Sequence, residues 1–401
     1  MITALRGMKD IFPPQNEKFT YFIDNASAIA QKYGFSFIET PILEETALFK
    51  RSVGESSDIV GKEMYQFIDK GGHDVCLRPE GTAGVVRAFI EKKYDRQGGI
   101  HRFYYYGPMF RYERPQKGRF RQFHQFGVES FGVASYLEDA NIILMLKEIL
   151  DFFSISYTLK LNSLGCTACM PPYRKKLVAF LEEVTSDLCE DCQRRKATNP
   201  IRVFDCKNEK CRQILQPAPR LETNLCEDCR SHFDALLALL DREGVVYELD
   251  PNLVRGLDYY NKTAFEFVSG DLGAQNAVAG GGRYDKLVSF LDGKETPAIG
   301  FAVGIERLME MIEVPTKPRE GYYFGALCEE AIAVLFGAAA TQRKTDKVTM
   351  GYEVKSLKAH LKAADKAGAR YCAVIGEDEL ANRKIWVKDL VEKRESLRDL
   401  E

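Results

Sequence analysis

The sequence predicts an α+β protein: an antiparallel sheet flanked by helices, interrupted by a cysteine-rich insertion and followed by a small C-terminal α/β domain. Aromatic and β-branched residues alternate with polar residues on both sides of the chain's centre, and this period of two is typical of half-buried antiparallel strands. Eight of the eleven cysteines lie between these runs. Pro315 and Pro318 then mark a linker. The predicted segments are 1–162, the insertion 163–244, 245–315 and the C-terminal domain 320–401.

The composition excludes disordered and fibrous proteins. With 401 residues, of which 45% are hydrophobic and 28% charged, the chain can form two or three domains of roughly 100–200 residues. Lys and Arg (56) nearly balance Asp and Glu (58), so a polyanion would have to be bound by a local basic patch. The longest apolar run, 331–340, is much shorter than the roughly 20 residues that span a bilayer, and the N-terminus has no signal-peptide core. We expect a soluble, cytoplasmic protein without a membrane partner.

The elements before the insertion follow from spacing and turn residues. Apolar residues at helical spacing predict an amphipathic helix over 16–33, which Gly34 ends. Two polar loops predict hairpins, one at Gly71-Gly72 and a longer one around 114–118. The predicted strands are 35–45, 63–79, 101–113 and 119–131, and a second helix is predicted over 139–153.

After the insertion, which a helix over 233–240 closes, the strand pattern resumes. A tight turn is preferred to a phosphate-binding loop at Gly280–Gly282. The predicted strands are 245–254, 263–268 and the alternating start of 298–312. In the C-terminal domain, the predicted strands are 348–354, 371–375 and 384–387, the last overlapping IWVKDL (385–390), and the helix is 356–367.

The longer hairpin carries the strongest chemical signal. Five cations crowd a short stretch of a chain that is acidic overall, which suits phosphate groups: Arg111, Arg114, Lys117, Arg119 and Arg121. Period-two geometry places Arg119, Arg121, Phe123, Gln125 and Glu129 on one face of the second strand. A zwitterionic ligand beside a polyphosphate would fit this face. A solvated basic hairpin explains the spacing equally well.

Two further patterns contain functional residue types. The segment LVRGLDYY (253–260) places Arg255 and two tyrosines in an apolar setting. The segment GFAVGIERL (300–308) is a glycine-punctuated strand that enters a helix with Arg307 near its start. Its glycines would let a flat ring approach the backbone, or would simply allow close packing of strand and helix.

All these segments in this order, with LRPEGT (77–82) upstream, resemble class II aminoacyl-tRNA synthetases, and specifically the histidyl-tRNA synthetase family. Pro41 in IETPILE resembles the motif 1 proline of the dimer interface, FRYERPQKGRFRQFHQFGVE resembles motif 2, and GFAVGIERL resembles motif 3. LVRGLDYY and GGGRYD resemble the two histidine-specific segments, which other class II enzymes do not share.

The resemblance implies the class II antiparallel sheet, a homodimer and an anticodon-binding C-terminal domain. The implied enzyme is a ligase that forms an aminoacyl-tRNA ester. It would activate L-histidine with ATP and Mg²⁺ to histidyl-adenylate and pyrophosphate, and would then transfer histidine to the 3′ end of tRNA(His). The sequence names no general base for the transfer step.

The resemblance also assigns residues. Arg111 and Arg255 would be catalytic cations at the α-phosphate, and Glu129 and Tyr260 would read the imidazole. The histidine site would be Glu80, Gly81, Thr82, Arg111, Gln125, Glu129, Arg255, Tyr259 and Tyr260. The ATP site would be Arg111, Glu113, Arg119 and Arg307, and the tRNA acceptor stem would meet Arg114, Gln116 and Arg121.

The cysteine-rich insertion departs from many family members, which have no cysteines there. Its eight cysteines form four close pairs, Cys166/Cys169, Cys189/Cys192, Cys206/Cys211 and Cys226/Cys229. In a reducing compartment such spacing favours zinc over disulfides, and eight thiolates suffice for two Cys₄ sites. One arrangement joins the second pair to the third and the first to the fourth. The alternative is one zinc site and one set of free thiols.

Two other functions remain open. One is the non-enzymatic regulatory paralogue of the family that partners ATP phosphoribosyltransferase, which the intact LVRGLDYY segment and the C-terminal domain oppose. The other is a zinc-dependent RNA-binding protein, which would leave Glu80, Glu129 and Arg307 without a purpose. Strand alternation turns His124 away from the predicted site, so we expect it to be structural, and we expect Trp386 to belong to a core.

Overall fold

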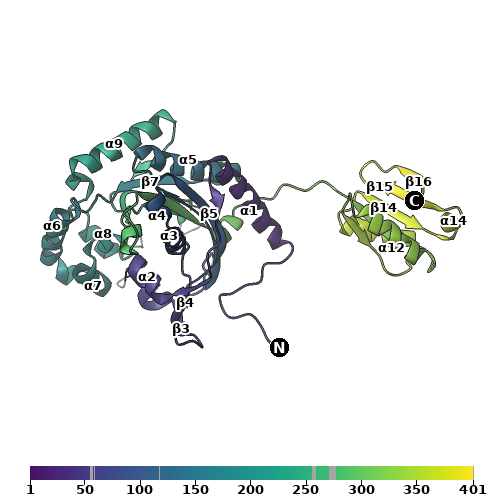
Figure 1. Cartoon of the computed structure of the whole chain (residues 1–401), viewed down its shortest axis with the longest axis horizontal. Helices are drawn as coiled ribbons and strands as arrows, with labels where there is room; N and C mark the ends of the chain where they lie inside the picture. Colours follow the sequence, from purple (N-terminus) through teal and green to yellow (C-terminus); the bar gives the residue numbers. More distant parts are fainter. Residues whose placement is uncertain (55–56, 58, 117, 255–258, 271–276, 401) are drawn as a thin grey trace. The chain divides into compact units, whose positions relative to one another are not determined.

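The computed structural model of the chain describes residues 1–400 except 55–56, 58, 117, 255–258 and 271–276. The chain divides into two compact units, unit 1 (Met1–Val314) and unit 2 (Pro315–Glu401), drawn in Figure 1. Among the described residues, no helix is long and apolar enough to cross a membrane.

An eight-stranded sheet forms the centre of unit 1. Its strands lie in the order β1-β5-β6-β11-β10-β9-β7-β8. The six strands from β5 to β7 pair antiparallel, whereas the two-residue edge strands β1 and β8 pair parallel to their neighbours. The bounds are β1 Ser36–Phe37, β5 His101–Phe110, β6 Gln122–Phe131, β7 Thr158–Ser163, β8 Glu248–Leu249, β9 Asn261–Val268, β10 Ala277–Arg283 and β11 Ala298–Gly304. The predicted α+β class with its antiparallel sheet is confirmed.

Helices cover both faces of this sheet. On one face α1, α5 and α9 enclose the largest apolar core, and Figure 1 shows them along the same side of the sheet. On the other face α3 and α10 pack on a second core that includes Tyr105, Phe131 and Tyr284. The bounds are α1 Gln15–Lys32, α2 Thr46–Val53, η1 Ile59–Glu63, α3 Thr82–Glu91, α4 Tyr94–Gln97, α5 Tyr136–Phe152, α9 Glu227–Arg242, α10 Leu287–Phe290 and α11 Ile305–Met309.

Both predicted hairpins are present. Strands β5 and β6 pair from His101 opposite Phe131 to Phe110 opposite Gln122, so the longer hairpin has the predicted antiparallel register. The Gly71-Gly72 turn joins β3 (Tyr65–Ile68) to β4 (Asp74–Leu77). The run predicted as one strand over 35–45 instead splits, because β1 joins the large sheet and β2 (Leu43–Glu45) pairs with β4 in a separate three-stranded sheet.

The turn predicted at Gly280–Gly282 is wrong, because all three glycines lie inside β10, between β9 and β11. A Cβ on Gly281 would lie 2.2 Å from the carbonyl oxygen of Gly300 and 2.6 Å from the ring of Phe265. Glycine therefore permits close packing of adjacent strands here. From the sequence alone, a run of glycines that serves this purpose looks the same as one that forms a turn. The strand predicted over 245–254 is also shorter than expected, since only β8 pairs there.

Arg283, at the end of β10, anchors a buried ion network. Its Nη2 lies 2.6 Å from Asp139 Oδ1, and both side chains are fully buried. His232 Nε2 lies 2.8 Å from Asp139 Oδ2, and Thr263 donates to the same oxygen. Burial would raise the pKa of Asp139, but the hydrogen bond from His232 and the charge of Arg283 hold it below its usual range. The network ties α5 to β9, β10 and α9.

The cysteine-rich insertion is built from short helices that gather at one end of unit 1 (Figure 1). They pack on a small core that includes Tyr173, Leu177 and Leu181 together with buried cysteines. The bounds are α6 Met170–Glu183, η2 Thr185–Asp187, α7 Glu190–Thr198, η3 Pro200–Asp205, α8 Glu209–Ile214 and η4 Glu222–Asn224.

Unit 2 is a five-stranded sheet in the order β13-β12-β14-β15-β16 with helices α12, α13 and α14. IWVKDL is not its last strand, as predicted, because β16 follows and pairs with β15. The five residues of β16 are all exposed, so no buried-face alternation marks them. Trp386 is half-buried and packs against a core cluster of this unit. The bounds are β12 Tyr322–Ala326, α12 Ala331–Gln342, β13 Val348–Met350, α13 Leu357–Lys366, β14 Tyr371–Ile375, α14 Glu377–Ala381, β15 Lys384–Asp389 and β16 Glu395–Asp399.

Candidate active site

A cavity of about 700 Å³ lies in unit 1 and gathers most of the predicted site residues. Strands β6, β9, β10 and β11 contribute to its walls, together with the loop of the long hairpin and part of the insertion. The predicted residues that line it are Glu80, Thr82, Arg111, Glu113, Arg119, Gln125, Tyr259, Tyr260 and Arg307. Gly81, Arg114, Gln116, Arg121 and Glu129 are not in its described lining, and Arg255 lies outside the described residues.

One end of the cavity presents a carboxylate held by a helix start. Glu80 Oε2 accepts the backbone N–H of Thr82 at 2.6 Å, and Oε1 accepts that of Ala83 at 2.9 Å. These are the first residues of α3, whose N–H groups have no partners inside the helix. Burial raises the pKa of Glu80, although the backbone donors and the charge of Arg111 oppose this shift. Glu80 is thus fixed in place with acceptor lone pairs to spare for a cationic group.

A second carboxylate lies behind this end, surrounded by hydroxyl groups. Glu129 Oε1 accepts hydrogen bonds from Thr82 Oγ1 at 2.7 Å and from the Tyr105 hydroxyl at 3.3 Å, and Oε2 accepts one from Tyr284. Burial raises the pKa of Glu129 to about 8, and the nearby charge of Glu80 adds to the shift. The two acidic groups therefore compete for ionisation within one pocket.

Two polar atoms of the pocket have no hydrogen bond of good geometry with the described residues. These two, among several such buried atoms on residues that line the cavity, are the hydroxyl of Tyr259 and Oε1 of Gln125. The ring of Tyr259 packs against those of Tyr260 and Tyr284, with centroids 4.7 and 5.6 Å apart. A buried polar group without a partner is costly, so these atoms indicate where a polar ligand completes the site.

Glycine at position 81 makes this pocket possible. A Cβ there would lie 2.2 Å from the ring of Tyr105. That ring is buried and presents its hydroxyl to Glu129. Gly81 thus lets the Tyr105 ring lie close to the backbone, and does not itself line the cavity.

The cavity becomes cationic beside Glu80, where Arg111 begins a group of three arginines. Arg111, Arg119 and Arg307 all line it. Arg111 Nε donates to the carbonyl of Pro79 at 2.9 Å, and Arg307 Nη1 donates to that of Ala277 at 2.6 Å, so backbone acceptors fix both side chains. Burial lowers the pKa of Arg307, and the charge of Arg119 adds to the shift. Three guanidinium groups in one partly buried space are repulsive unless an anion joins them.

Glu113 is the counter-charge at this end. Its Oε2 lies 2.7 Å from Arg119 Nη1, and its Oε1 lies 3.9 Å from Arg111 Nη1. Small residues of β10 and β11 form the adjoining wall: Ala277, Val278, Ala279, Gly280, Ala302 and Gly304. This combination leaves room for a flat ring beside a set of cations.

In the loop of the long hairpin, Arg121 departs from the face that strand alternation predicted. Arg114 and Gln116 are exposed, and Gln116 pairs with Arg119 in a backbone bridge. Arg121 precedes β6, and its guanidinium stacks over the ring of Tyr112 at 3.8 Å, while its Nε donates to the carbonyl of Glu113. Strand alternation therefore does not extend to Arg121, because regular pairing begins one residue later.

His124 is held by Glu306, whose carboxylate accepts its backbone N–H at 2.9 Å and lies 2.8 Å from its Nδ1. Its ring also packs edge-on against Phe19. These contacts agree with a structural role on the side of the strand away from Gln125.

Sequence reasoning missed three groups at the cavity. Tyr105 and Tyr284 hold Glu129, and only the position of Tyr284 within GGGRYD could have signalled one of them. The third group comes from the insertion: Arg195, Arg202, Phe204, Lys207 and Arg212. No local pattern distinguishes these cations from an ordinary solvated surface.

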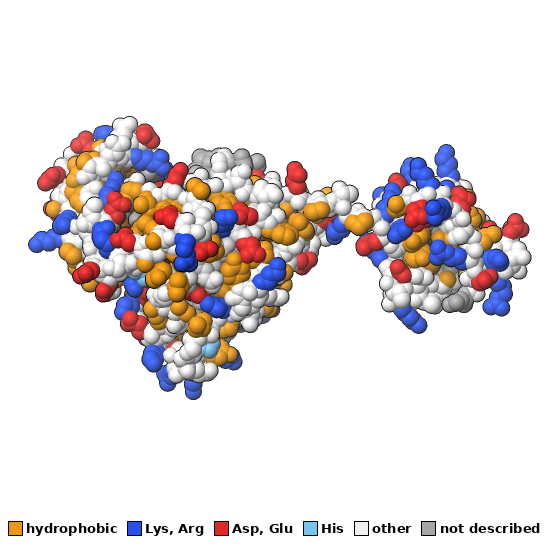
Figure 2. All heavy atoms as spheres, turned by 90° about the horizontal axis from the view of Figure 1, so that it is seen from above, with side chains coloured by type: hydrophobic (Ala, Val, Ile, Leu, Met, Phe, Trp, Pro, Cys, Tyr) orange, Lys and Arg blue, Asp and Glu red, His pale blue; other side chains and the backbone are white. Residues whose placement is uncertain are grey.

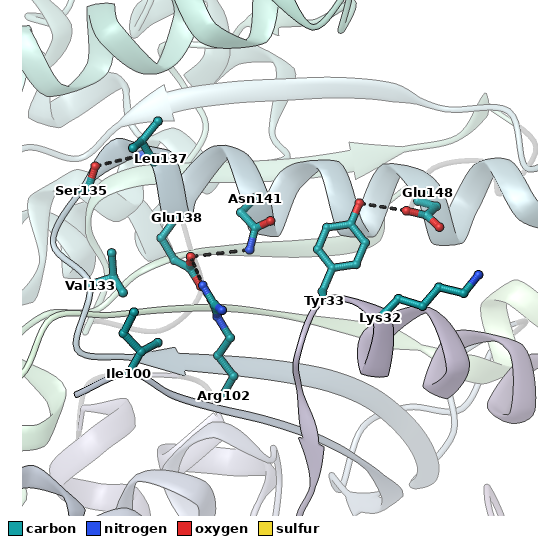
Figure 3. A pocket seen from close by; sticks show the side chains of 10 residues that line it. All are labelled: Lys32, Tyr33, Ile100, Arg102, Val133, Ser135, Leu137, Glu138, Asn141 and Glu148. Atoms are coloured by element: carbon teal, nitrogen blue, oxygen red, sulfur yellow. Dashed lines mark hydrogen bonds and ion pairs between the residues drawn. The ribbon is translucent and has the colours of Figure 1, made fainter. Parts of the chain in front are cut away.

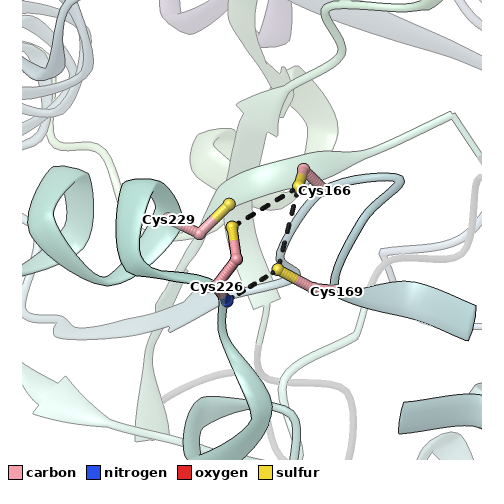
Figure 4. Close-up of side chains that lie close together, drawn as sticks. All are labelled: Cys166, Cys169, Cys226 and Cys229. Carbon is pink, nitrogen blue, oxygen red and sulfur yellow. Dashed lines mark hydrogen bonds between the residues drawn. The ribbon is translucent and has the colours of Figure 1, made fainter. Parts of the chain in front are cut away.

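The eight paired cysteines form two clusters. The first cluster is Cys166, Cys169, Cys226 and Cys229, drawn in Figure 4, and the second is Cys189, Cys192, Cys206 and Cys211. Within each cluster all four sulfur atoms lie within 4.8 Å of one another. This is the arrangement that joins the second pair to the third and the first to the fourth.

Another cavity, of about 580 Å³, opens between α1, β5 and α5 (Figure 3). Its polar groups already bind one another. Arg102 Nη2 lies 2.6 Å from Glu138 Oε2, and Tyr33 donates to Glu148 at 2.8 Å. We therefore assign it no ligand.

Comparisons with known proteins agree with one another. A sequence model of the family described as histidyl-tRNA synthetase matches residues 7–308. Two relatives named histidine–tRNA ligase, from Nitratiruptor sp. and Sulfurimonas denitrificans, are each 63% identical, over 100% and 98% of this chain and 98% of their own length. The crystal structure of apo histidyl-tRNA synthetase from S. aureus covers 100% of this chain and 98% of that chain, with a TM-score of 0.84 and 35% identity.

The match to the family extends through the hairpin, the cavity and the glycine-rich strands, and the relatives align over nearly their whole length. The chain therefore belongs to the histidyl-tRNA synthetase family.

Proposed function

We propose that the chain is a histidine–tRNA ligase. It activates L-histidine with ATP to histidyl-adenylate and pyrophosphate, and then transfers histidine to the 3′ end of tRNA(His). The observation that carries this proposal is a single cavity that joins buried carboxylates and polar atoms without partners to three arginines, of which Arg111 lies beside Glu80. Such a cavity suits a zwitterionic amino acid beside a polyphosphate.

At the acidic end, Glu80 and Thr82 hold the ammonium group of histidine, with Gln125 assisting through its unpaired oxygen. Glu129 and Tyr260 read the imidazole, one as acceptor and one as donor, since a neutral imidazole has one nitrogen of each kind. Because the pKa of Glu129 is raised to about 8, this carboxyl must release its proton to accept a hydrogen bond from the imidazole, so histidine binding and proton release are coupled.

At the cationic end, Arg111 and Arg307 contact the phosphates, and Arg307 also stacks on adenine beside the small-residue wall. Glu113 and Arg119 complete the ATP site, and Arg255 is assigned the second position at the α-phosphate from its place in LVRGLDYY. The histidine carboxylate attacks the α-phosphorus and pyrophosphate leaves. Each preorganised cation at the developing charge is worth about 3–4 kcal/mol. Mg²⁺ on the β- and γ-phosphates would neutralise the remaining charge.

In the transfer step, the terminal ribose hydroxyl of tRNA attacks the adenylate carbonyl, the bond to the phosphate breaks, and AMP leaves. Arg114 and Gln116 are exposed on the hairpin loop, where the acceptor stem can reach them. Unit 2 is assigned the anticodon. On the face drawn in Figure 2, cationic and anionic side chains are interspersed over both units, so tRNA must be bound through local contacts of this kind.

We also propose a homodimer formed around Pro41. Three exposed apolar side chains are close to it in the sequence, Phe37, Ile42 and Leu43, with exposed fractions of 46%, 42% and 42%. Contiguous exposed apolar surface commonly marks an interface between subunits. A ligase with these substrates works where translation takes place, so we assign it to the cytoplasm.

ATP–pyrophosphate exchange measured with each of the twenty amino acids, without tRNA, tests the proposal. Exchange with histidine alone is expected, since a pocket of buried polar groups rejects analogues that leave them unpaired. No exchange with any amino acid, from protein shown to be folded, would contradict the ligase and favour the regulatory paralogue that partners ATP phosphoribosyltransferase.

The acceptor-stem assignment has a separate test. Gln116→Ala should weaken charging of tRNA(His) and leave histidine-dependent exchange unchanged, because Gln116 is exposed and does not line the cavity. Equal losses in both reactions would contradict the assignment.

A further inference from the structure

The two cysteine clusters have the dimensions of tetrahedral zinc sites. In the first cluster Cys166 Sγ lies 3.7 Å from Cys169 Sγ and 3.8 Å from Cys226 Sγ, and in the second Cys189 Sγ lies 3.8 Å from Cys206 Sγ. A zinc ion with four sulfur ligands at about 2.3 Å in a tetrahedron separates those sulfurs by about 3.8 Å. A disulfide would require about 2.05 Å, and all eleven cysteines are unbonded to one another.

Backbone donors serve both clusters in the same way. The N–H of Cys226 donates to Cys169 Sγ at 3.1 Å, and that of Cys189 donates to Cys211 Sγ at 3.2 Å. In each case the donor is the N-cap residue of a helix, α9 or α7. Donors aimed at sulfur from the surrounding backbone are what a thiolate ligand of a metal requires. Two independent clusters therefore share one geometry and one pattern of support.

The insertion also needs a cross-link. Helices α7 and α8 have nine and six residues, too few to be stable without strong tertiary contacts. The core they pack on is small, and five of its buried members are cysteines of the clusters: Cys169, Cys192, Cys206, Cys211 and Cys229. Two metal ions would replace the apolar contacts that this core lacks.

The second cluster connects the elements that wall the cavity. Its cysteines lie at the start of α7, at the end of η3 and within α8. The same three elements, with the short link before α8, supply the cavity with Arg195, Arg202, Lys207 and Arg212. Arg212 Nε also donates to the carbonyl of Cys206 at 3.1 Å, so this cation is attached directly to the cluster.

We propose that both clusters bind structural Zn²⁺, and that the zinc of the second cluster holds this wall of four cations at the active-site cavity. The first zinc joins the beginning and end of the insertion beside β7 and α9. Neither ion reaches the reacting atoms. The role of the second zinc is to position the wall. The tests below measure metal content and proteolysis rather than ligase activity, so their failure would not count against the proposed function.

Metal content is the first test. Protein purified without chelator should carry two zinc ions per chain by atomic emission. Cys211→Ser and Cys229→Ser should each lose one, and Cys328→Ser, the same change in a buried cysteine of unit 2, should lose none. Replacement by Co²⁺ should give the intense visible spectrum of tetrahedral thiolate ligation. Zinc-free protein with cysteines in disulfides would overturn the proposal.

Limited trypsin digestion tests the wall, because trypsin cleaves after the four cations themselves. Loss of the second zinc in Cys211→Ser should speed cleavage at Arg195, Arg202, Lys207 and Arg212 by at least about tenfold, since cleavage follows the population of the opened segment. If the variant does not fold, graded chelation of the parent protein gives the same comparison. Unchanged cleavage at these residues after measured loss of that zinc would refute the positioning role.

Discussion

Removal of the Tyr259 hydroxyl separates ligand binding from stability. The side chain is 3% exposed, and its hydroxyl makes no hydrogen bond of good geometry with the described residues. Burial raises its pKa well above the usual value, and the charges of Glu80 and Glu129 add to this, so the group is a neutral phenol. Tyr259→Phe keeps the ring contacts with Tyr260 and Tyr284 and deletes only the oxygen.

Tyr259→Phe should maintain or raise the free energy of unfolding but weaken histidine binding. An unsatisfied buried polar group costs about 1–3 kcal/mol, so its deletion should leave the free energy of unfolding unchanged or raise it. A hydrogen bond to a charged group, such as the ammonium of histidine, contributes about 1.5–3 kcal/mol. Its loss should raise the KM for histidine roughly 10- to 100-fold in pyrophosphate exchange.

Tyr173→Phe is the matched control. Tyr173 is also buried, but it lies in the insertion and its hydroxyl donates to the carbonyl of Pro219 at 3.2 Å. This variant should lose about 0.5–1.5 kcal/mol of unfolding free energy, measured in urea, and keep the parental KM. A Tyr259→Phe variant with parental KM and parental stability would refute the argument that the unpaired hydroxyl awaits histidine.

Three further changes test the buried framework by urea unfolding. Asp139→Asn breaks the ion pair with Arg283 and should lower the free energy of unfolding by about 3–5 kcal/mol. Because the folded pKa of Asp139 is lowered from 3.8, the parent should lose this extra stability as the pH falls below about 4. Glu129→Gln should gain stability relative to the parent as the pH rises from 4.5 to about 8, because the parental carboxyl, with its pKa raised from 4.5 to about 8, resists ionisation in the folded state. Gly281→Ala should destabilise by about 1–3 kcal/mol, since its Cβ would meet the carbonyl of Gly300.

Each of these has a clear contrary result. A loss below 1 kcal/mol for Asp139→Asn would mean that the network is not buried as described. If the free energies of unfolding of Glu129→Gln and the parent differed by the same amount at every pH, the pKa of Glu129 would not be raised in the folded state. Parental stability of Gly281→Ala would favour the turn that the sequence suggested over the strand.

The long hairpin and the first helix could be read from the sequence because their signals are local. Alternation with a polar loop determines β5 and β6, and helical spacing ended by Gly34 determines α1. Strand β16 could not be read, because an edge strand with all side chains exposed has no apolar face to reveal it. Gly280–Gly282 misled for a related reason, since glycine marks turns and tight strand packing alike.

The sequence by itself determined the family, the antiparallel class and nine of the residues that line the cavity, because chemistry-bearing motifs are short and keep their order along the chain. Only the tertiary structure decided that Tyr105 and Tyr284 hold Glu129, that Arg121 stacks on Tyr112, and how the cysteines group. It also brought the cations of the insertion to the cavity. These are contacts between segments distant in sequence, which depend on how strands and helices pack and leave no periodic mark in the chain.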